Sequence, residues 1–427
     1  MTSDEHTMAS LDGSSALAQA GLGPTPRAAI TQEATAPRRK PSRRARRLTE
    51  LGPHLQAGTL HLVLPDGERL TFRGSRPGPE AVFDVRRTRV MRRFLLGGHL
   101  AFGDAYVDGD WDSPDVAALL HYFLVNEPYF TLEGSFLLRA LQRLLHRFRD
   151  NSKRRARDNI AAHYDLGNAF YARWLDPGMS YSSGCFEGSD CDLETSQHNK
   201  YRRMADLADI RPGQRVLEIG CGWGGFAEYA AQRGASVVGL TLSREQLDYA
   251  AARVARAGLA DRVELRLQDY RDVAGQFDRV VSIEMIEAVG EPYWPVYFDK
   301  IRAVLAPGGR AALQAILIDD ARWEVYRSSP DFIQRHIFPG GMLPTPSRLR
   351  QAVAQAGLRW VGDSGFGADY VRTLRQWRDR FIAAWPEIAP LGFDERFRRL
   401  WNYYLCYCEA GFAFGSIDVR QIALTRD

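Results

Sequence analysis

The second half of the chain alternates short apolar runs with segments of helical periodicity. Five runs of mostly Val, Leu, Ile and Ala, each bounded by polar or turn residues, predict buried strands. Residues 226–231 and 245–257, which lie between them, have helical spacing. Strands that alternate with helices predict a parallel, doubly wound α/β sheet of the Rossmann-like type. The predicted strands are residues 215–219, 236–240, 263–267, 277–283 and 310–318.

A smaller mixed α/β domain is predicted before this sheet. Residues 60–64 and 70–72 flank the turn signal Pro65-Asp66-Gly67 and predict a hairpin, and an apolar helical stretch follows through Phe123. Residues 137–148 then carry the Leu and Phe stripe of an amphipathic helix with basic outer faces. The predicted organisation is a tail at 1–47, a small lipid-associated domain at 48–135, a basic amphipathic helix at 136–160 and a large domain at 161–427.

Charge is distributed unevenly along a chain that is nearly neutral. Its 427 residues hold 56 Lys and Arg against 52 Asp and Glu, a balance that argues against a strongly basic nucleic-acid-binding protein. Residues 1–47 have the composition of a disordered tail, with eight basic and four acidic groups. Residues 139–157 hold eight basic groups and one acidic group. A solvated tail explains the first segment, and packing against the protein is the commoner explanation of the second. The alternative for both is contact with an anionic lipid surface.

Other classes of protein are excluded by simple patterns. No run approaches 18 apolar residues, and the N-terminus lacks the apolar region of a secretory signal. The five cysteines form no disulfide framework, and no cluster has metal-ligand spacing. The sequence therefore predicts a reduced, cytoplasmic protein without a metal or a membrane span.

A glycine-rich loop joins the first predicted strand of the large domain to the next helix. It runs from Glu218 through Gly220, Gly222 and Gly224. Glycine lets a backbone approach a ligand closely, and this spacing differs from the dinucleotide-binding pattern. The charged head of S-adenosylmethionine needs no phosphate cradle, and Glu218 can offset its positive charge. The alternative is a glycine turn that only closes a strand–helix corner.

Several motifs in a fixed order resemble the cyclopropane-fatty-acyl-phospholipid synthase family of class I methyltransferases. The resemblance covers nearly the whole chain from the small domain onward. It implies a seven-stranded methyltransferase sheet and S-adenosylmethionine as cofactor. The motifs that carry it are residues 103–109, 163–168, 174–177, 181–184, 216–224, 238–243, 338–341 and 366–370.

The segments after the second and third strands are predicted to hold the sugar and the base of the cofactor. The second strand lacks the terminal acid that usually binds the ribose, so hydroxyl and amide groups are expected to bind it. After the third strand, Asp269 is placed to accept the adenine amino group and Tyr270 to stack on the ring. The resemblance implies that Tyr164, Tyr181 and Ser182 close over the methionine end of the cofactor. The predicted cofactor-binding residues are Tyr164, Tyr181, Ser182, Glu218, Gly220, Gly222, Gly224, Thr241, Leu242, Ser243, Gln246, Gln268, Asp269 and Tyr270.

The resemblance also implies a reaction. A methyl group passes from S-adenosylmethionine to the cis double bond of a phospholipid acyl chain, and loss of a proton from the added carbon closes a cyclopropane ring. In relatives a bound bicarbonate ion is thought to take that proton. The implied partner is a phospholipid bilayer, with the enzyme peripheral on the inner face of the membrane. A homodimer and a reductase partner are left open.

The implied anion site is altered in this chain. The predicted catalytic residues are Glu287, Tyr370, Ser183 and Gln314. Ser183 stands where the family has Cys, and Ala288 and Gln314 stand where it has His. Ser183 and Gln314 can still donate hydrogen bonds to an anion, or Glu287 or a water acts as the base instead. Cyclopropanation is the favoured product, and a methylene- or methyl-branched chain without a ring is the alternative.

Simpler interpretations remain beside these predictions. Tyr370 also fits a core position, and five aromatic residues fit either an acyl tunnel or the core, namely Trp174, Tyr293, Trp294, Phe338 and Trp377. A methyltransferase for a small soluble acceptor would not need the small domain or the basic segments. A non-catalytic lipid-binding scaffold would not need the intact glycine loop and Glu287.

Overall fold

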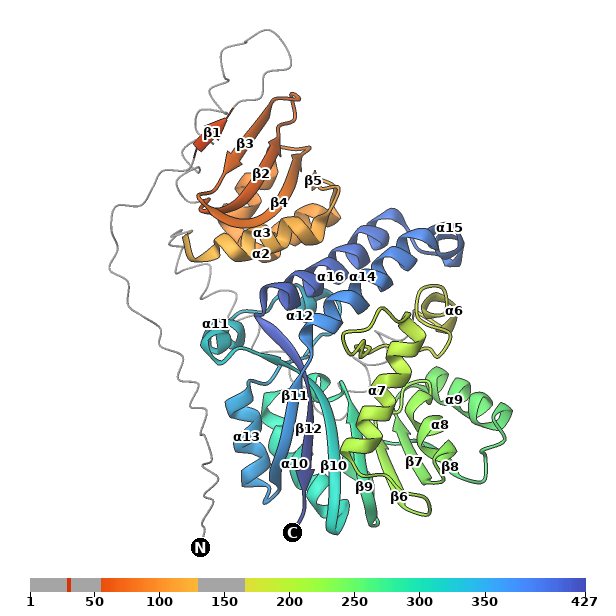
Figure 1. The fold of residues 1–427 in the computed structure, drawn as a ribbon. Helices are drawn as coiled ribbons and strands as arrows, with labels where there is room; N and C mark the ends of the chain where they lie inside the picture. Colours follow the sequence, from red (N-terminus) through yellow and green to blue (C-terminus); the bar gives the residue numbers. More distant parts are fainter. Residues whose placement is uncertain (1–28, 32–54, 130–165) are drawn as a thin grey trace, which may run out of the picture.

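Two β-sheets of different size organise the protein (Figure 1). The computed structural model describes residues 29–31, 55–129 and 166–427, so most of the predicted tail and the whole predicted basic helix at 136–160 lie outside the described residues. The small sheet has the strand order β1-β3-β2-β4-β5, and the large sheet has the order β11-β12-β10-β9-β6-β7-β8.

The small sheet confirms the predicted hairpin and adds a parallel strand to it. Antiparallel pairing joins β2 to β3, and β4 lies parallel to β2 on the other side. Gly58 has φ 74°, and a Cβ there would lie 2.2 Å from the carbonyl oxygen of Pro79, so glycine permits this close approach to β4. The elements of the small domain are β1 (Ala29–Thr31), β2 (Ala57–Val63), β3 (Arg69–Arg73), β4 (Arg76–Val85), α2 (Arg89–Val107), β5 (Trp111–Asp112), α3 (Val116–Asn126) and η2 (Glu127–Tyr129).

The large sheet confirms the five predicted strands within the large domain. Four of them match within one residue, and β10 begins earlier than predicted. The predicted seven-stranded, doubly wound sheet is confirmed and is mostly parallel. At one edge β12 pairs antiparallel with both β10 and β11. The strands are β6 (Arg215–Ile219), β7 (Ser236–Thr241), β8 (Val263–Leu267), β9 (Phe277–Ile283), β10 (Leu305–Ile318), β11 (Arg359–Gly365) and β12 (Ile417–Thr425).

Helices cover both faces of the large sheet. Alternate strand residues point to opposite faces, and Val216 packs with α7, α8 and α9 while its neighbour Leu217 packs with α10 and α13. Val280 and Val281 divide in the same way. The helices of the large domain are α6 (Asn168–Tyr171), α7 (Leu193–Leu207), α8 (Gly225–Gln232), α9 (Arg244–Arg256), α10 (Trp294–Val304), α11 (Trp323–Ser328), α12 (Phe332–His336), α13 (Pro346–Gln355), α14 (Gly367–Ala383), α15 (Trp385–Ile388) and α16 (Glu395–Phe414).

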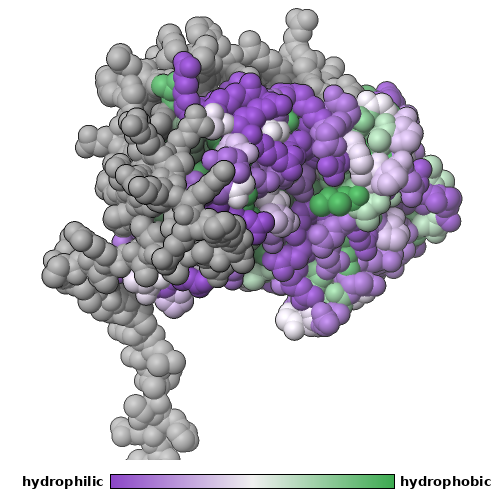
Figure 2. All heavy atoms as spheres, turned by 90° about the horizontal axis from the view of Figure 1, so that it is seen from above, coloured by the Kyte–Doolittle hydropathy of each residue, from purple (hydrophilic) through white to green (hydrophobic). Residues whose placement is uncertain are grey.

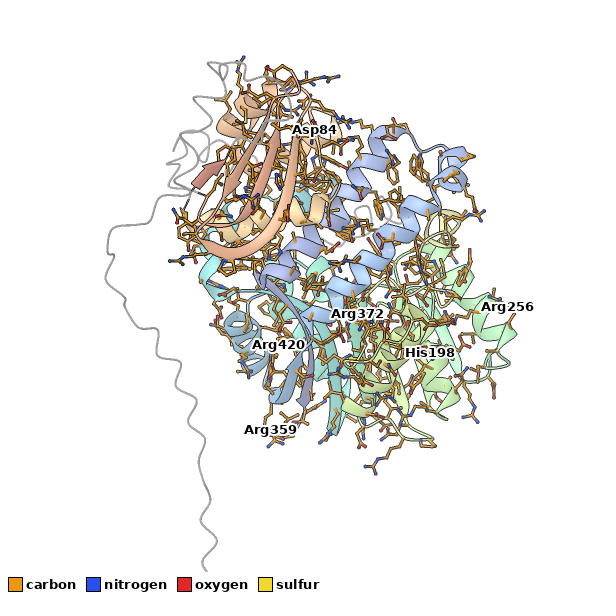
Figure 3. All side chains as sticks on the ribbon, turned by 45° about the horizontal axis from the view of Figure 1, so that its top comes forward. Asp84, His198, Arg256, Arg359, Arg372 and Arg420 are labelled. Atoms are coloured by element: carbon orange, nitrogen blue, oxygen red, sulfur yellow. The ribbon has the colours of Figure 1, made fainter. Side chains whose placement is uncertain are left out.

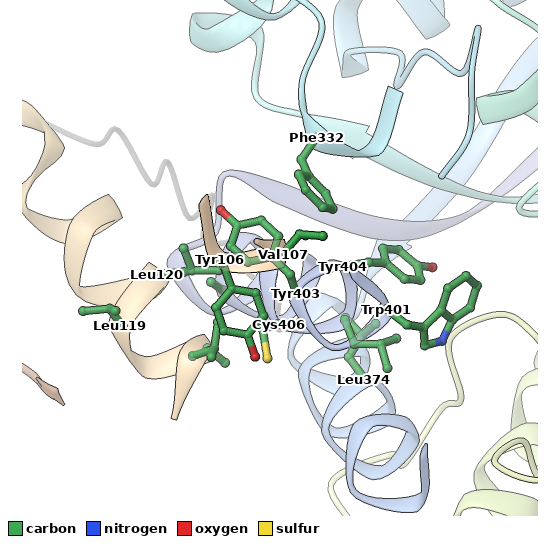
Figure 4. Packing of buried hydrophobic residues seen from close by; sticks show 14 of the residues in the cluster. Tyr106, Val107, Leu119, Leu120, Phe332, Leu374, Trp401, Tyr403, Tyr404 and Cys406 are labelled. Atoms are coloured by element: carbon green, nitrogen blue, oxygen red, sulfur yellow. The ribbon is translucent and has the colours of Figure 1, made fainter. Parts of the chain in front are cut away.

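The helices α14 and α16 lie side by side between the two sheets and join the domains (Figure 1). Arg399 on α16 is buried and donates hydrogen bonds to the carbonyl oxygens of Tyr106 and Trp111 and to the Asp112 carboxylate. The Tyr403 ring on the same helix packs at a tilt against Phe332 of α12, with ring centroids 4.5 Å apart (Figure 4). A continuous apolar core therefore runs from the small domain through α16 into the large domain.

The described face seen from above is largely polar, with small separate hydrophobic patches (Figure 2). Charged side chains such as Arg256 and Arg359 point outward from the ends of α9 and β11 (Figure 3). Within the described ranges, no helix is both long and apolar enough to span a bilayer, and no group of His, Cys, Asp and Glu could hold a metal ion.

Candidate active site

A cavity of about 900 Å³ opens at the carboxyl ends of β6, β7, β9 and β10. This edge is where parallel α/β sheets bind ligands, because the chain crosses to opposite sides of the sheet between β6 and β9. The volume lies in the range that accommodates a cofactor together with part of a substrate. Twelve of the predicted site residues line it, namely Tyr181, Ser182, Glu218, Gly220, Gly222, Thr241, Leu242, Gln246, Gln268, Tyr270, Glu287 and Tyr370.

The glycine loop forms the wall of the cavity next to β6. The strand ends at Ile219. Gly220, Gly222 and Gly224 follow with φ of 83°, 51° and 81°, values that residues with a side chain rarely adopt. A Cβ on Gly220 would lie 2.9 Å from the side chain of Met285. Gly224 precedes α8 and does not line the cavity. The loop therefore needs glycine for its backbone path, and Gly220 and Gly222 expose peptide groups to a ligand.

Glu218 presents an unsatisfied carboxylate oxygen at this end of the cavity. One of its oxygens, Oε2, is buried and has no hydrogen-bond partner. Burial raises the pKa of Glu218 to about 8, while Lys200, Arg253 and the backbone amide of Ala227 act in the opposite direction. A buried carboxyl without a full set of partners is stabilised by a cationic group. The positively charged end of S-adenosylmethionine fits this requirement.

The segment after β7 divides the predicted ribose-binding residues into two roles. Thr241, Leu242 and Gln246 line the cavity, and the Thr241 hydroxyl donates to the Gln246 side-chain oxygen at 2.9 Å. Ser243 does not line the cavity, because its hydroxyl caps the N-terminus of α9 and accepts from the Gln246 amide at 3.3 Å. In this structure Ser243 therefore positions the helix that carries Gln246.

Of the residues predicted to bind the cofactor after β8, two line the cavity and one does not. Gln268 and Tyr270 line the cavity, and burial raises the pKa of Tyr270 to about 12. Asp269 does not line it, and its two carboxylate oxygens accept from Arg271 at 2.9 and 2.6 Å. The predicted adenine contact of Asp269 stays a prediction, in competition with this bidentate pair.

The predicted lid over the methionine end is described in part. Tyr181 lines the cavity and its hydroxyl bonds to that of Tyr404 on α16 at 2.7 Å. The Ser182 hydroxyl accepts from the fully buried ammonium of Lys200. Burial lowers the pKa of Lys200 to about 8. Tyr164 lies outside the described residues.

A carboxylate that sequence reasoning missed lies at the centre of the predicted catalytic residues. Glu284 follows β9 directly and lines the cavity. Its Oε1 accepts from the backbone amide of Ser183 at 2.9 Å and from Nε2 of Gln314 at 2.8 Å, and its Oε2 accepts from the Tyr370 hydroxyl at 2.7 Å. Three of the four predicted catalytic residues therefore meet at Glu284. Ser183 and Gln314 do not line the cavity themselves.

The orientation of these donors is fixed by further contacts. The side-chain oxygen of Gln314 accepts from Nε2 of Gln421 at 2.9 Å, which turns the Gln314 amide nitrogen toward Glu284. The Ser183 hydroxyl donates to the carbonyl oxygen of Gly184, so its backbone amide, not its side chain, contacts the carboxylate. The predicted side-chain donation by Ser183 to an anion is therefore replaced here by a backbone contact.

The backbone of Glu284 is strained. Its φ is 49°, in the left-handed region, which costs a residue with a Cβ about 1 kcal/mol. Its amide donates to the carbonyl oxygen of Gln314 at 2.8 Å, so Gln314 holds both the backbone and the side chain. A chemistry-bearing residue at the end of a central strand was a usable sequence signal, but its strained backbone was not visible in the sequence.

Glu287, the fourth predicted catalytic residue, is a second buried carboxyl beside Glu284. Its Oε1 accepts from the backbone amide of Ile316 at 2.5 Å, and its Oε2 is buried without a hydrogen-bond partner. Burial, and then the charge of Glu284, raise the pKa of Glu287 to about 8. Two adjacent carboxyls with different donors form a pair in which one member holds a proton while the other is ionised.

The remainder of the cavity is mainly apolar and aromatic. Its walls include Leu374 and Tyr404 of the α14–α16 layer (Figure 4) and Leu124 of the small domain. Of the five aromatic residues considered for a tunnel, Phe338 lines the cavity, whereas Trp174, Trp294 and Trp377 are buried in the core. At the small-domain end, Arg322 donates to the Glu127 carboxylate at 2.7 Å. This mainly apolar lining suits the hydrocarbon part of a substrate.

Known proteins are similar to this chain in both sequence and fold. The family model for mycolic acid cyclopropane synthetase matches residues 151–422. The chain is 40% identical over 378 residues to the tuberculostearic acid methyltransferase UfaA1 of Mycobacterium tuberculosis, covering 86% of this chain and 88% of the relative. It is 37% identical over 364 residues to the cyclopropane-fatty-acyl-phospholipid synthase of Escherichia coli strain K12, covering 84% and 90%.

Solved structures support the same relationship. The cyclopropane synthase MmaA2 from Mycobacterium tuberculosis matches with a TM-score of 0.60 and 29% identity, covering 63% of this chain and 98% of that one. The mycolic acid cyclopropane synthase CmaA1, complexed with SAH and CTAB, matches with a TM-score of 0.60 and 28% identity, with the same coverage.

Proposed function

Because the chain belongs to the mycolic acid cyclopropane synthetase family of S-adenosylmethionine-dependent methyltransferases, we propose that it builds a cyclopropane ring on the cis double bond of an acyl chain in a membrane phospholipid. Members of the family transfer a carbon from S-adenosylmethionine to an unsaturated acyl chain. The phospholipid substrate is supported by the Escherichia coli relative, which is named for it.

One observation carries the proposal. A single cavity contains the unsatisfied Glu218 carboxylate, the Glu284 and Glu287 pair and an otherwise mainly apolar lining. The first suits a cationic cofactor, the second suits removal of a proton, and the third suits a hydrocarbon chain. A methyltransferase for a small polar acceptor would not need a mainly apolar cavity.

The residues of the chain have distinct tasks in this reaction. S-adenosylmethionine, when bound, supplies a methyl group as an electrophile. Glu218 holds its cationic end, and the walls of the cavity exclude water from a reaction in which the alkene is a weak nucleophile. The rings of Tyr181, Tyr370 and Phe412 border the same cavity, and aromatic faces favour the cation that forms on the acyl chain.

A second product is supported by one comparison. The relative with 40% identity is named for tuberculostearic acid and as a methyltransferase. The alternative is therefore methyl transfer followed by a hydride shift and proton loss, which gives a methylene branch without a ring. A reductase would be needed only if such a branch is reduced further.

The product can be identified with purified enzyme and vesicles. Phospholipid vesicles with cis-unsaturated chains are incubated with S-adenosylmethionine carrying a ¹³C-labelled methyl group, and the extracted lipid is analysed by NMR and mass spectrometry. We expect labelled cyclopropyl signals, and none from vesicles with saturated chains or from a mixture without enzyme. Labelled olefinic methylene signals alone would establish the branched product instead.

Membrane contact and assembly need separate measurements. The two basic sequence segments support peripheral binding to the inner face of the membrane, so flotation with anionic vesicles should exceed flotation with neutral vesicles and should weaken as salt is raised. Removal of residues 1–47 should weaken flotation while cofactor affinity is retained. Light scattering of the full chain tests the proposed homodimer.

A further inference from the structure

The altered anion site can be compared directly with the ion that the resemblance assigns to it. The Ser183 backbone amide, the Gln314 side chain and the Tyr370 hydroxyl all contact the carboxylate of Glu284 at 2.7–2.9 Å. These are the positions to which the resemblance assigns a bicarbonate ion. A planar anion with its oxygens at these donors would overlap the Glu284 carboxylate, so bicarbonate does not fit among them in this arrangement.

The Glu284 carboxylate has the chemical properties of the ion it would replace. Both anions are planar groups with two oxygens that share a negative charge. Here the two oxygens accept three hydrogen bonds from three separate segments: the loop before α7, the strand β10 and the helix α14. The side chain also lines the cavity, so the carboxylate is held at the wall where a substrate would lie.

The neighbouring acid allows Glu284 to be the ionised member of the pair. Burial raises the pKa of both carboxyls, but at Glu284 the hydrogen bonds from Tyr370, Ser183 and Gln314 and the charge of Lys200 oppose that effect. Glu287 has backbone donors only, and the charge of Glu284 raises its pKa further. The proton shared by two adjacent carboxyls therefore resides on Glu287.

We infer that the carboxylate of Glu284 replaces a bound bicarbonate ion and is itself the base that removes the proton from the added methyl group. This inference rests on the proposed function. It adds a catalytic residue and makes the reaction independent of dissolved bicarbonate.

The step is balanced without a further reactant. The π electrons of the alkene form a bond to the methyl carbon as the carbon–sulfur bond breaks toward sulfur, which leaves a cation on the neighbouring carbon. A C–H bond of the added methyl then breaks, its electron pair closes the ring to that cationic carbon, and the proton passes to Glu284. The neutral acid later returns its proton to solvent.

Two substitutions at Glu284 test the inference. Glu284→Gln keeps the shape and removes the base, so ring formation should fall by about 10²- to 10⁴-fold. Glu284→Gly empties the anion site and suits φ 49°, so this variant should fold. Its activity in bicarbonate-free buffer should be equally low and should rise at least tenfold with added bicarbonate or formate. Glu264→Gln, which changes an exposed carboxylate on β8 outside the cavity, should remain at the wild-type rate.

A binding measurement tests the site without catalysis. The ¹³C NMR signal of labelled bicarbonate should be broadened by Glu284→Gly and not by wild type. S-adenosylmethionine affinity, measured by calorimetry, should change less than threefold in both Glu284 variants, because Glu218 holds the cofactor.

The possible failures can be told apart. If the wild-type enzyme modifies acyl chains but loses activity when bicarbonate is removed, or if Glu284→Gln retains its full rate, the inference is overturned and the proposed function stands. If the wild-type enzyme modifies no unsaturated lipid under either condition, the proposed function fails. Bicarbonate binding to wild type as tight as to Glu284→Gly would overturn the inference on binding grounds alone.

Discussion

Binding of the cofactor should release a proton from Glu218. Burial raises the pKa of this carboxyl to about 8 in the unliganded protein. At pH 7 about nine in ten molecules therefore hold it as the neutral acid. A cationic ligand beside its unpartnered oxygen favours the carboxylate, so binding should release most of a proton at pH 7 and progressively less as the pH rises through 8.

The Glu218→Gln variant gives the magnitude of this contribution. Glutamine keeps the size of the side chain and cannot ionise. A hydrogen bond to a charged group contributes about 1.5–3 kcal/mol, so above pH 9 the variant should bind S-adenosylmethionine about 10- to 150-fold more weakly than wild type. At pH 7 wild type must first ionise Glu218, and the ratio of dissociation constants should be about tenfold smaller than at pH 9.

Calorimetry in buffers of different ionisation enthalpy measures the proton release. Lys200 faces Glu218 and has a lowered pKa of about 8, and Arg253 contributes a fixed charge, so Lys200 is the other protein group that titrates here. The α-amino group of the ligand titrates in the same range. The contribution of the ligand amino group remains in Glu218→Gln and cancels in the difference between the two proteins. The pKa of Lys200 depends on the charge of Glu218, so that difference reports the coupled Glu218–Lys200 pair. Equal proton release by wild type and variant, or a ratio of dissociation constants independent of pH, would refute the assignment.

Three further predictions concern stability. Glu218 and Glu287 hold extra protons in the folded state between pH 4.5 and 8, so these two groups should make the stability of the unliganded protein fall as pH rises toward 8; equal pH dependence of urea unfolding in wild type and in Glu218→Gln would contradict this. Arg399→Met removes a buried donor from two carbonyl oxygens and from the Asp112 carboxylate, which keeps its pair with Arg86, and should cost about 3 kcal/mol in urea unfolding, whereas the exposed Arg256→Met should cost less than about 0.5 kcal/mol. Gly220→Ala should cost about 1–2 kcal/mol because φ is 83°, and should weaken S-adenosylmethionine binding in calorimetry; unchanged affinity would show that the loop does not approach the ligand.

The strands of the large sheet could be predicted because their signal is local. Residues 263–267 and 277–283 are apolar runs bounded by turns, and the structure has strands at the same positions. The direction of β12 is not a local property. It depends on α16, which returns the chain to the far side of β10, and no periodicity in residues 417–425 records that return. The parallel pairing of β4 with β2 also depends on a connection and not on a pattern.

For a similar reason the sequence predicts the placement of some site residues and not of others. Glu218 and Gly220 belong to one continuous motif, so a single stretch of sequence predicts their placement beside the cavity. Ser243 matched the same kind of pattern, yet a hydroxyl before a helix has a second use as a cap, and the structure shows that use. Glu284 itself is visible in the sequence as an acidic residue directly after a predicted strand. What the sequence does not contain is the meeting of three donors from distant segments, which alone distinguishes this carboxylate from Glu287.

The choice between a ring and a branch follows from a competition of two rates. A hydride shift is internal to the acyl chain and needs no base, whereas ring closure needs proton loss before that shift occurs. A dissolved anion must occupy its site in every catalytic cycle, but a carboxylate attached to the end of β9 is always present, and fixed geometry raises the rate of proton transfer. With Glu284 as the base, the altered residues Ser183 and Gln314 are therefore not a loss of the anion site. They position an internal anion, and an internal anion favours the faster proton loss that closes the ring.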